Sequence, residues 1–185
     1  MKQAVRMVLV ATAVVSLSGC FAGLGLEPAD VANAFGVGAH DALNSYFNAQ
    51  QFAVASVPGP SSGSATYTYD DLDGTLDGEI DFAAFEVTAT SGDTYELSGL
   101  ASLIISWTLN QSEDLVITAE YDTGDSAVAI SKNGDTAVDV VGNVTLEITV
   151  GWDMQENLVL AIISTGTVNG QDVSGESTIT YAPQF

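Results

Sequence analysis

The single cysteine of the chain, Cys20, is the residue with the most specific chemistry. It follows Leu17, Ser18 and Gly19, at the end of an apolar run that starts at Met7. A thiolate is readily alkylated to a thioether. Because the sequence holds one thiol, an intramolecular disulfide is excluded.

The segment before Cys20 has the features of a secretory signal. Lys2 and Arg6 form a positive n-region, and the apolar run 7–17 matches an h-region in length but is too short to span a bilayer. Leu17-Ser18-Gly19-Cys20 resembles the bacterial lipobox. The resemblance implies that residues 1–19 are a lipoprotein signal peptide and that Cys20 becomes the mature N-terminus, anchored to a membrane by diacylglycerol and chains such as palmitate. The alternative is an ordinary secretory signal.

The residue after the cysteine bears on where such a lipoprotein goes. In lipoproteins of the enteric type, a non-acidic residue at this place implies sorting to the outer membrane, and here it is Phe21. We therefore expect a cell-envelope protein, on the periplasmic or the surface face of the outer membrane rather than at the inner membrane.

The charge balance limits the partners. Removing residues 1–19 leaves Lys132 as the one basic side chain besides His40, against 24 acidic residues, for a net charge of −23. So acidic a surface repels nucleic acid and anionic headgroups, which excludes both as expected partners. The main interpretation is solubility or adaptation to salt, which screens carboxylate repulsion; a role for divalent cations is the alternative.

One acidic stretch, residues 70–81, superficially resembles a calcium-binding loop. Asp73, Asp77 and Asp81 are its candidate ligands, because hard cations need several converging oxygens. With Asp73 in the first position, the twelfth position is Ala84, where a bidentate carboxylate belongs. We therefore favour a solvated hairpin turn over a metal site, and the same holds for the acidic loop 122–125.

Other catalytic arrangements lack their residues. The single histidine, His40, stands beside Asp41 in a helical segment, with no serine placed near it by the sequence, so a nucleophilic triad is not expected. Zinc ligands and a phosphate-binding glycine loop are missing, and no glycosidase pair stands out among 24 carboxylates. We expect no enzyme, no catalytic residue and no cofactor.

The mature chain divides into four segments. Residues 20–28 are expected to be a lipidated tether, 29–52 an amphipathic helix, 53–64 a linker and 65–185 an antiparallel β domain. The helix carries an apolar stripe with a spacing of four residues, which must be buried against something. Gly36 and Gly38 weaken its middle and suggest a break there.

Alternation of apolar and polar residues predicts the strands. A turn at Asp73-Gly74 pairs Tyr69 with Gly78 and Ala65 with Phe82 on one face, and a change of parity at Ala83-Ala84 predicts a bulge. Alternation then continues from Tyr95 to Leu109, from Leu115 to Tyr121 and from Val138 to Trp152. A turn at Asn169-Gly170 places Leu160 opposite Ile179 and Leu158 opposite Tyr181.

These patterns predict a mainly β protein with one N-terminal helix. About eight antiparallel strands form an up-and-down meander with one continuous apolar face, curled into a barrel or half-barrel and packed on the helix. A membrane-spanning barrel with its apolar face outward is disfavoured, because its narrow interior would have to hold most of the carboxylates.

Four aromatic residues are expected near one end of the sheet: Tyr95, Tyr121, Trp152 and Tyr181. They are candidates for ringing the mouth of an apolar pocket, although aromatic residues also simply favour strands. The leading hypothesis is a non-enzymatic, lipid-anchored envelope protein that has a structural role or binds another envelope protein. One alternative is a carrier or sensor of lipid or another apolar ligand, loosely similar in fold to lipocalins and periplasmic lipoprotein carriers. A hydrolase is the other.

Overall fold

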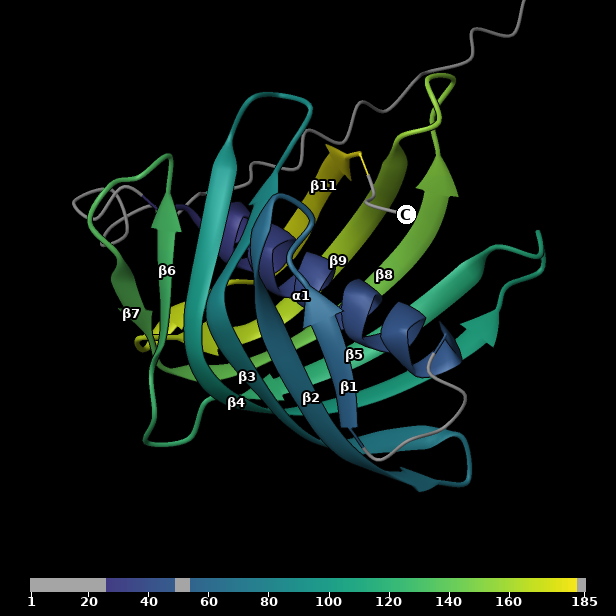
Figure 1. The fold of residues 1–185 in the computed structure, drawn as a ribbon, viewed down its shortest axis with the longest axis horizontal. Helices are drawn as coiled ribbons and strands as arrows, with labels where there is room; N and C mark the ends of the chain where they lie inside the picture. Colours follow the sequence, from purple (N-terminus) through teal and green to yellow (C-terminus); the bar gives the residue numbers. More distant parts are fainter. Residues whose placement is uncertain (1–25, 49–53, 183–185) are drawn as a thin grey trace, which may run out of the picture.

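The computed structural model describes residues 26–48 and 54–182, which form one helix and one antiparallel sheet (Figure 1). Helix α1 spans Pro28–Asn48. The strands are β1 Val54–Pro58, β2 Ser62–Leu72, β3 Thr75–Thr88, β4 Thr94–Leu109, β5 Leu115–Asp122, β6 Val128–Lys132, β7 Val138–Val140, β8 Gly142–Trp152, β9 Leu158–Val168, β10 Gln171–Asp172 and β11 Gly175–Tyr181. Signal peptide residues 1–19 and Cys20 lie outside the described residues.

The sheet is a meander that curls around the helix. Its strands follow the order β1-β2-β3-β4-β5-β8-β9-β10, while β11 also pairs with β9, and β6 pairs with both β4 and β7. The curl is a half-barrel and does not close, although a single bridge between Ala89 and Tyr181 brings the end of β3 to the end of β11. The predicted fold class, mainly β with one N-terminal helix inside a curled meander, is confirmed.

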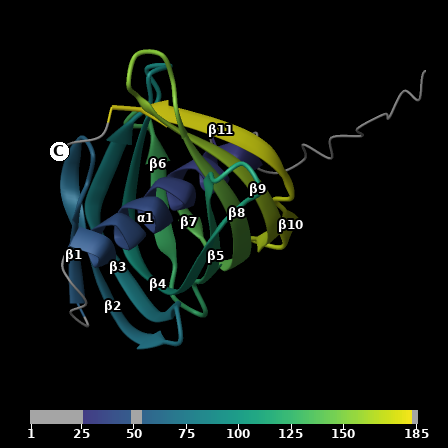
Figure 2. The same cartoon turned by 90° about the vertical axis from the view of Figure 1, so that its right-hand side faces the viewer.

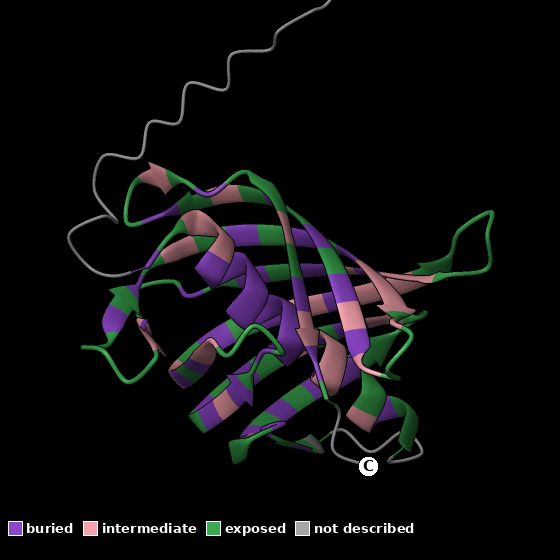
Figure 3. Cartoon of the chain, turned by 90° about the horizontal axis from the view of Figure 1, so that it is seen from above, coloured by how far each residue is buried: buried purple, intermediate pink, exposed green. Residues whose placement is uncertain are grey.

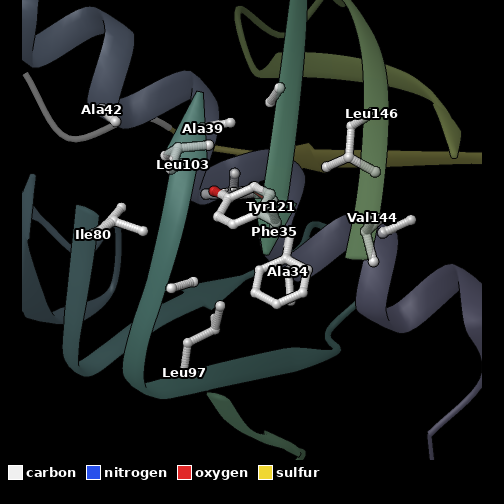
Figure 4. Packing of buried hydrophobic residues seen from close by; sticks show 14 of the residues in the cluster. Ala34, Phe35, Ala39, Ala42, Ile80, Leu97, Leu103, Tyr121, Val144 and Leu146 are labelled. Carbon is white, nitrogen blue, oxygen red and sulfur yellow. Dashed lines mark hydrogen bonds between the residues drawn. The ribbon is translucent and has the colours of Figure 1, made fainter. Parts of the chain in front are cut away.

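Helix α1 lies inside this curl (Figure 2). Residues 30–39 are buried on every side, whereas Pro28 and Ala29 at the start of the helix and a face from His40 onward are partly exposed. At the centre, the ring of Phe35 stacks on that of Tyr121 with 4.4 Å between centroids, surrounded by Leu103, Leu146 and other core side chains (Figure 4). Burial of this one face drives the assembly, at about 25 cal/mol for each Å² of apolar surface removed from water.

The start of the helix is fixed by local chemistry. Glu27 is the N-cap residue: its N–H donates to Asp30 Oδ2 at 2.8 Å, which satisfies one of the free donors of the first turn. Pro28 fits the first helical position, because its fixed φ suits a helix and its missing N–H is not needed there. Leu26 is fully buried, so the predicted tether 20–28 already enters the core at its end.

The predicted break at Gly36 and Gly38 is wrong, because the helix runs unbroken through both. Each glycine instead marks a close approach to the sheet. A Cβ at position 36 would lie 2.5 Å from Ile162 Cδ1, and one at position 38 would lie 3.0 Å from the Phe82 ring and 3.1 Å from Tyr121 Oη. Close packing against the sheet therefore explains both glycines. The predicted helix end at 52 lies outside the described residues.

The hairpin predictions are confirmed residue by residue. Tyr69 pairs with Gly78 and Ala65 with Phe82, and both turn residues, Asp73 and Gly74, have positive φ, as a two-residue hairpin turn of type I′ requires. The register of β3 on β4 shifts between Phe82 and Phe85, which is the predicted bulge. At the C-terminal end, Leu160 pairs with Ile179 and Leu158 with Tyr181.

Two sequence predictions need correction. The predicted linker 53–64 contains β1, which pairs with β2 despite Pro58 because this strand lies at the sheet edge, where one side needs no ladder bonds. The continuous strand predicted from Val138 to Trp152 is divided after Val140. Gly142 has φ 148°, and there the chain leaves β6 and joins β5. Such divisions raise the strand number to 11, above the expected eight or so.

The two faces of the sheet have opposite chemistry (Figure 3). On the concave face Leu103, Ile105, Leu146 and Ile148 are fully buried, whereas Glu96 and Glu147 are exposed on the convex face. The convex face thus stays hydrated, as the alternation predicts. Among the described residues, no helix combines the length and the apolar character that crossing a bilayer requires.

Candidate binding surface

A buried polar cluster holds the N-terminal end of α1. Asp30 is almost fully buried, and its Oδ1 accepts hydrogen bonds from Tyr95 Oη and Lys132 Nζ, each at 2.8 Å. Lys132 also lies 3.8 Å from Asp93. The hydrogen bond to Asp30 raises the pKa of Lys132, and burial raises that of Tyr95. The cluster therefore joins β4, β6 and the helix through a charged pair.

The other candidate ligand-binding tyrosines also bond to the helix. Tyr121 Oη donates to the carbonyl oxygen of Phe35 at 2.9 Å, and Tyr181 Oη lies 3.1 Å from His40 Nδ1 and 3.2 Å from Asp41 Oδ1. Burial raises the pKa of both phenols. The structure thus places Tyr95, Tyr121 and Tyr181 at three levels along α1, not around a common opening.

Trp152, the fourth candidate, is separate from these tyrosines. It stands at the end of β8 opposite Leu158, and its side chain is 57% exposed. It therefore belongs to a different part of the molecule, the apolar strand ends described below.

The candidate calcium ligands are not brought together. Asp73 occupies the exposed β2–β3 turn, while Asp77 and Asp81 lie on the convex face of β3, four residues and so about 13 Å apart along the strand. One calcium ion needs oxygens within about 2.6 Å. Within the described residues, no group of three or more His, Cys, Asp or Glu side chains is arranged to hold a metal ion.

A small polar cleft lies where the sheet nearly closes. It has a volume of about 190 Å³ and is bordered by the β3–β4 turn, by β11 and by Asn33 of the helix. The side-chain Oδ1 of Asn33 has no hydrogen-bond partner among the described residues, but it is also shielded from solvent. The cleft therefore offers hydroxyl groups and Asp93, whereas Asn33 Oδ1 is not accessible from it.

A larger feature lies at the other end of the helix, where the strands continue beyond it (Figure 1). Here the concave side of the sheet keeps its apolar residues but extends past the described end of α1 at Asn48. We call it the strand-end surface; it consists of Phe47, Trp107, Leu109, Leu115, Val150 and Trp152. Phe47, Leu109 and Trp152 are 51%, 66% and 57% exposed.

Contacts and register make these residues neighbours. The rings of Phe47 and Trp107 have centroids 5.3 Å apart, and Leu109 pairs with Leu115 across β4 and β5. Val116 pairs with Thr149, so continuing this register by one residue sets Leu115 beside Val150. The strand-end surface is therefore one continuous apolar row across three strands and the end of the helix.

Carboxylates surround this surface. They are Asp71 at the β2–β3 tip, Glu113 and Asp114 at the β4–β5 tip, and Asp153 and Glu156 at the β8–β9 tip. A hydrogen bond from the Asn157 side chain, followed by backbone N–H donors, lowers the pKa of Asp153. Tyr46 Oη donates to Asp71 at 2.7 Å, and this bond raises the pKa of Tyr46 to about 12. We call these five residues the acidic rim.

No basic side chain of the described residues neutralises the acidic rim. The ion pairs of the described residues join Lys132 to Asp30 and Asp93, and His40 to Asp41. All of them lie away from the strand ends. Alternation alone shows that Leu109 and Trp152 face inward. It does not show that the described part of α1 ends at Asn48, short of these residues, so the surface could not be predicted from the sequence.

A scan against models of known protein families, a search of curated proteins and a search of solved structures each found no match for this chain.

Proposed function

We propose that the protein is a lipid-anchored lipoprotein of the cell envelope with a non-enzymatic role in binding. The observation that carries the binding role is the strand-end surface, an apolar row in which Phe47, Leu109 and Trp152 are exposed together. Exposed apolar patches with a polar border are typical of interaction sites. The location rests on the lipobox-like sequence that ends at Cys20.

The position of the surface supports this role. If Cys20 carries the lipid, six residue steps separate it from buried Leu26, and they reach at most about 20 Å. Helix α1 then extends over 21 residues, about 32 Å, before the strand-end surface begins. The anchor and the surface therefore lie at opposite ends of the helix, which leaves the surface available to other envelope proteins.

The packing of α1 favours this role over that of a carrier with an internal pocket. Residues 30–39 of the helix fill the space in which a barrel carrier would hold its ligand. An apolar ligand would have to displace Phe35, whose ring stacks on Tyr121. A hydrolase has no supporting observation, because the His40 side chain bonds to Asp41 and Tyr181 rather than to a serine.

Anchoring can be tested by expressing the full chain in a bacterium with the lipoprotein pathway and supplying labelled palmitate. We expect the label in the protein and the protein in the outer-membrane fraction. Cys20→Ala should lose both, whereas Ser18→Ala, which keeps a small residue before the cysteine, should retain them. An unlabelled, freely soluble parent chain would refute the lipoprotein assignment.

A further inference from the structure

We propose that the strand-end surface binds an amphipathic segment of a partner protein that carries both apolar and basic side chains. This inference deepens the proposed binding role and names the chemistry of its partner. It does not depend on the lipid anchor, so its test is made on protein without lipid.

The apolar part of the proposal follows from what the surface exposes. Phe47, Leu109 and Trp152 are each more than half exposed, and Met154 in the adjoining turn is 97% exposed. Trp107, Leu115 and Val150 lie behind them and pack against the core, so they form a firm base. Exposed aromatic and methionine side chains on a rigid base are typical of protein-binding sites.

The charge of the surroundings selects the partner. The acidic rim places carboxylates on three hairpin tips around the apolar row, and no basic side chain in the described ranges 26–48 and 54–182 pairs with them. A membrane with anionic lipids would be repelled, and a second copy would bring the same carboxylates face to face. A segment with apolar side chains flanked by lysine or arginine can pack on the apolar row and pair its charges with the carboxylates of the acidic rim.

Fluorescence gives a direct readout, because both tryptophans of the chain, Trp107 and Trp152, lie in the strand-end surface. The protein is the mature chain from residue 20 with Cys20→Ser, which keeps every described element. The probe is a tryptophan-free synthetic amphipathic helix of leucine and lysine. We expect saturable binding with a blue shift of the emission, and an affinity that falls at least about tenfold on going from low salt to 0.5 M NaCl.

Two comparison peptides separate the contributions. Replacing lysine by glutamate should abolish binding, and replacing leucine by serine should weaken it at least about tenfold. Equal binding of the lysine–leucine and lysine–serine peptides would overturn the proposal, since it would show attraction to net charge alone.

Matched variants of the protein locate the site. Leu109→Ser should weaken binding about tenfold, whereas Ile163→Ser, a 49% exposed apolar residue on the convex face, should not. The double variant Glu113→Gln with Glu156→Gln should weaken binding, whereas Glu120→Gln with Glu147→Gln on the convex face should leave it unchanged. If both members of either pair behave alike, the site is not the strand-end surface.

The same readout reports the other occupants. Phe52 follows Asn48, the described end of α1, by four positions in the sequence. Blue-shifted emission in the free protein that Phe52→Ser reverses would mean that the chain covers the surface itself. A blue shift with zwitterionic vesicles alone would indicate a lipid contact, and dimers in sedimentation that Leu109→Ser dissociates would indicate self-association. Any of these three results would overturn the proposal.

Discussion

Lys132 is the one lysine or arginine after residue 19, and the fold uses it to hold the helix. Its Nζ reaches Asp30, 102 positions earlier in the chain, and the carboxylate also accepts from Tyr95. A buried carboxylate without its cation is costly because it has lost water as well as its partner. One residue thus connects the β6 strand to the N-terminal end of α1.

Replacing Lys132 by methionine should lower the free energy of unfolding by about 3–5 kcal/mol, the range for a buried charge left without its partner. The lysine is partly exposed, which favours the lower end. Urea unfolding followed by circular dichroism measures the loss. Adding Asp30→Asn to the variant should restore part of the stability, because it removes the stranded charge. A single variant as stable as the parent would contradict the structural role of the pair.

The raised pKa values of the tyrosines predict how the free energy of unfolding changes with pH. All six have raised pKa values, that of Tyr46 to about 12, chiefly through its bond to Asp71, and those of Tyr67, Tyr69, Tyr95, Tyr121 and Tyr181 chiefly through burial. The unfolded chain would ionise its phenols near pH 10. Their contribution is therefore fully present below pH 10 and is lost as the pH rises through the higher folded-state values.

We expect the absorbance of tyrosinate at 295 nm to appear late, together with loss of the circular-dichroism signal, when the pH is raised from 9 to 12.5. The raised pKa of Lys132 acts in the same direction. A titration centred at pH 10, with the fold intact, would contradict the burial of these phenols and the bond from Tyr46 to Asp71.

The roles of these tyrosines could not be predicted from the sequence. Alternation correctly turned Tyr95, Tyr121 and Tyr181 toward the interior, because parity within a strand is local. Their hydrogen-bond partners are on α1, at sequence distances from 65 to 141 residues, and no local pattern encodes the axial position of a helix inside a curled sheet. For the same reason, the strand-end surface could not be predicted from the sequence.

At the scale of elements, the sheet curls around α1, and the helix packs against its concave face (Figure 2). Gly36 and Gly38 let it approach strands on opposite sides, and Gly38 lies between the Phe82 ring and the Tyr121 hydroxyl. Tyr121 is held by its bond to Phe35, so it has little freedom to withdraw. A larger residue at position 38 therefore has no space.

Gly38→Val should lower the free energy of unfolding by about 1–3 kcal/mol, the usual cost of overfilling a packed core. The control Asn44→Val places the same side chain on the exposed part of the helix. Because asparagine and valine have similar helix propensities, this variant should change the free energy of unfolding by less than about 0.5 kcal/mol. Thermal and urea unfolding of both variants make the comparison. Equal stability of the two would mean that position 38 does not contact the sheet.

Hairpins were predictable because their determinants are adjacent in the sequence. At Asp73-Gly74 and at Asn169-Gly170, turn chemistry and parity together fix the register. The division of strands was not predictable. β4 pairs first with β6 and then with β5, and the change occurs near Gly99, which has φ 125°. Apolar parity continues unchanged across such a point, so nothing local marks the change of partner.

At the scale of the whole molecule, charge is the dominant feature. The described domain holds one lysine and all 24 acidic residues, most of them on the convex face and at the turns. Repulsion among like charges favours the expanded, unfolded chain, and salt weakens it as the Debye length falls from about 10 Å at 0.1 M to about 3 Å at 1 M.

Raising NaCl from 0.05 to 1 M should therefore stabilise the domain by about 1 kcal/mol or more, a rise in Tm of roughly 3 °C. KCl should act equally, and CaCl₂ at the same ionic strength should add nothing, because the candidate calcium ligands are dispersed. Differential scanning calorimetry provides the measurement. A distinct gain at millimolar calcium would point instead to a specific site on the acidic turns.

The contact between α1 and the last described strand limits when the core can form. Tyr181, in the last strand, reaches His40 in the first helix across 141 positions, and the end of β11 is bridged to Ala89. Until that final segment has emerged, the helix lacks one of its walls and the hydrophobic centre stays open. If the chain is exported, as proposed above, we expect it to stay unfolded during translocation and to complete its core only when β11 is in place.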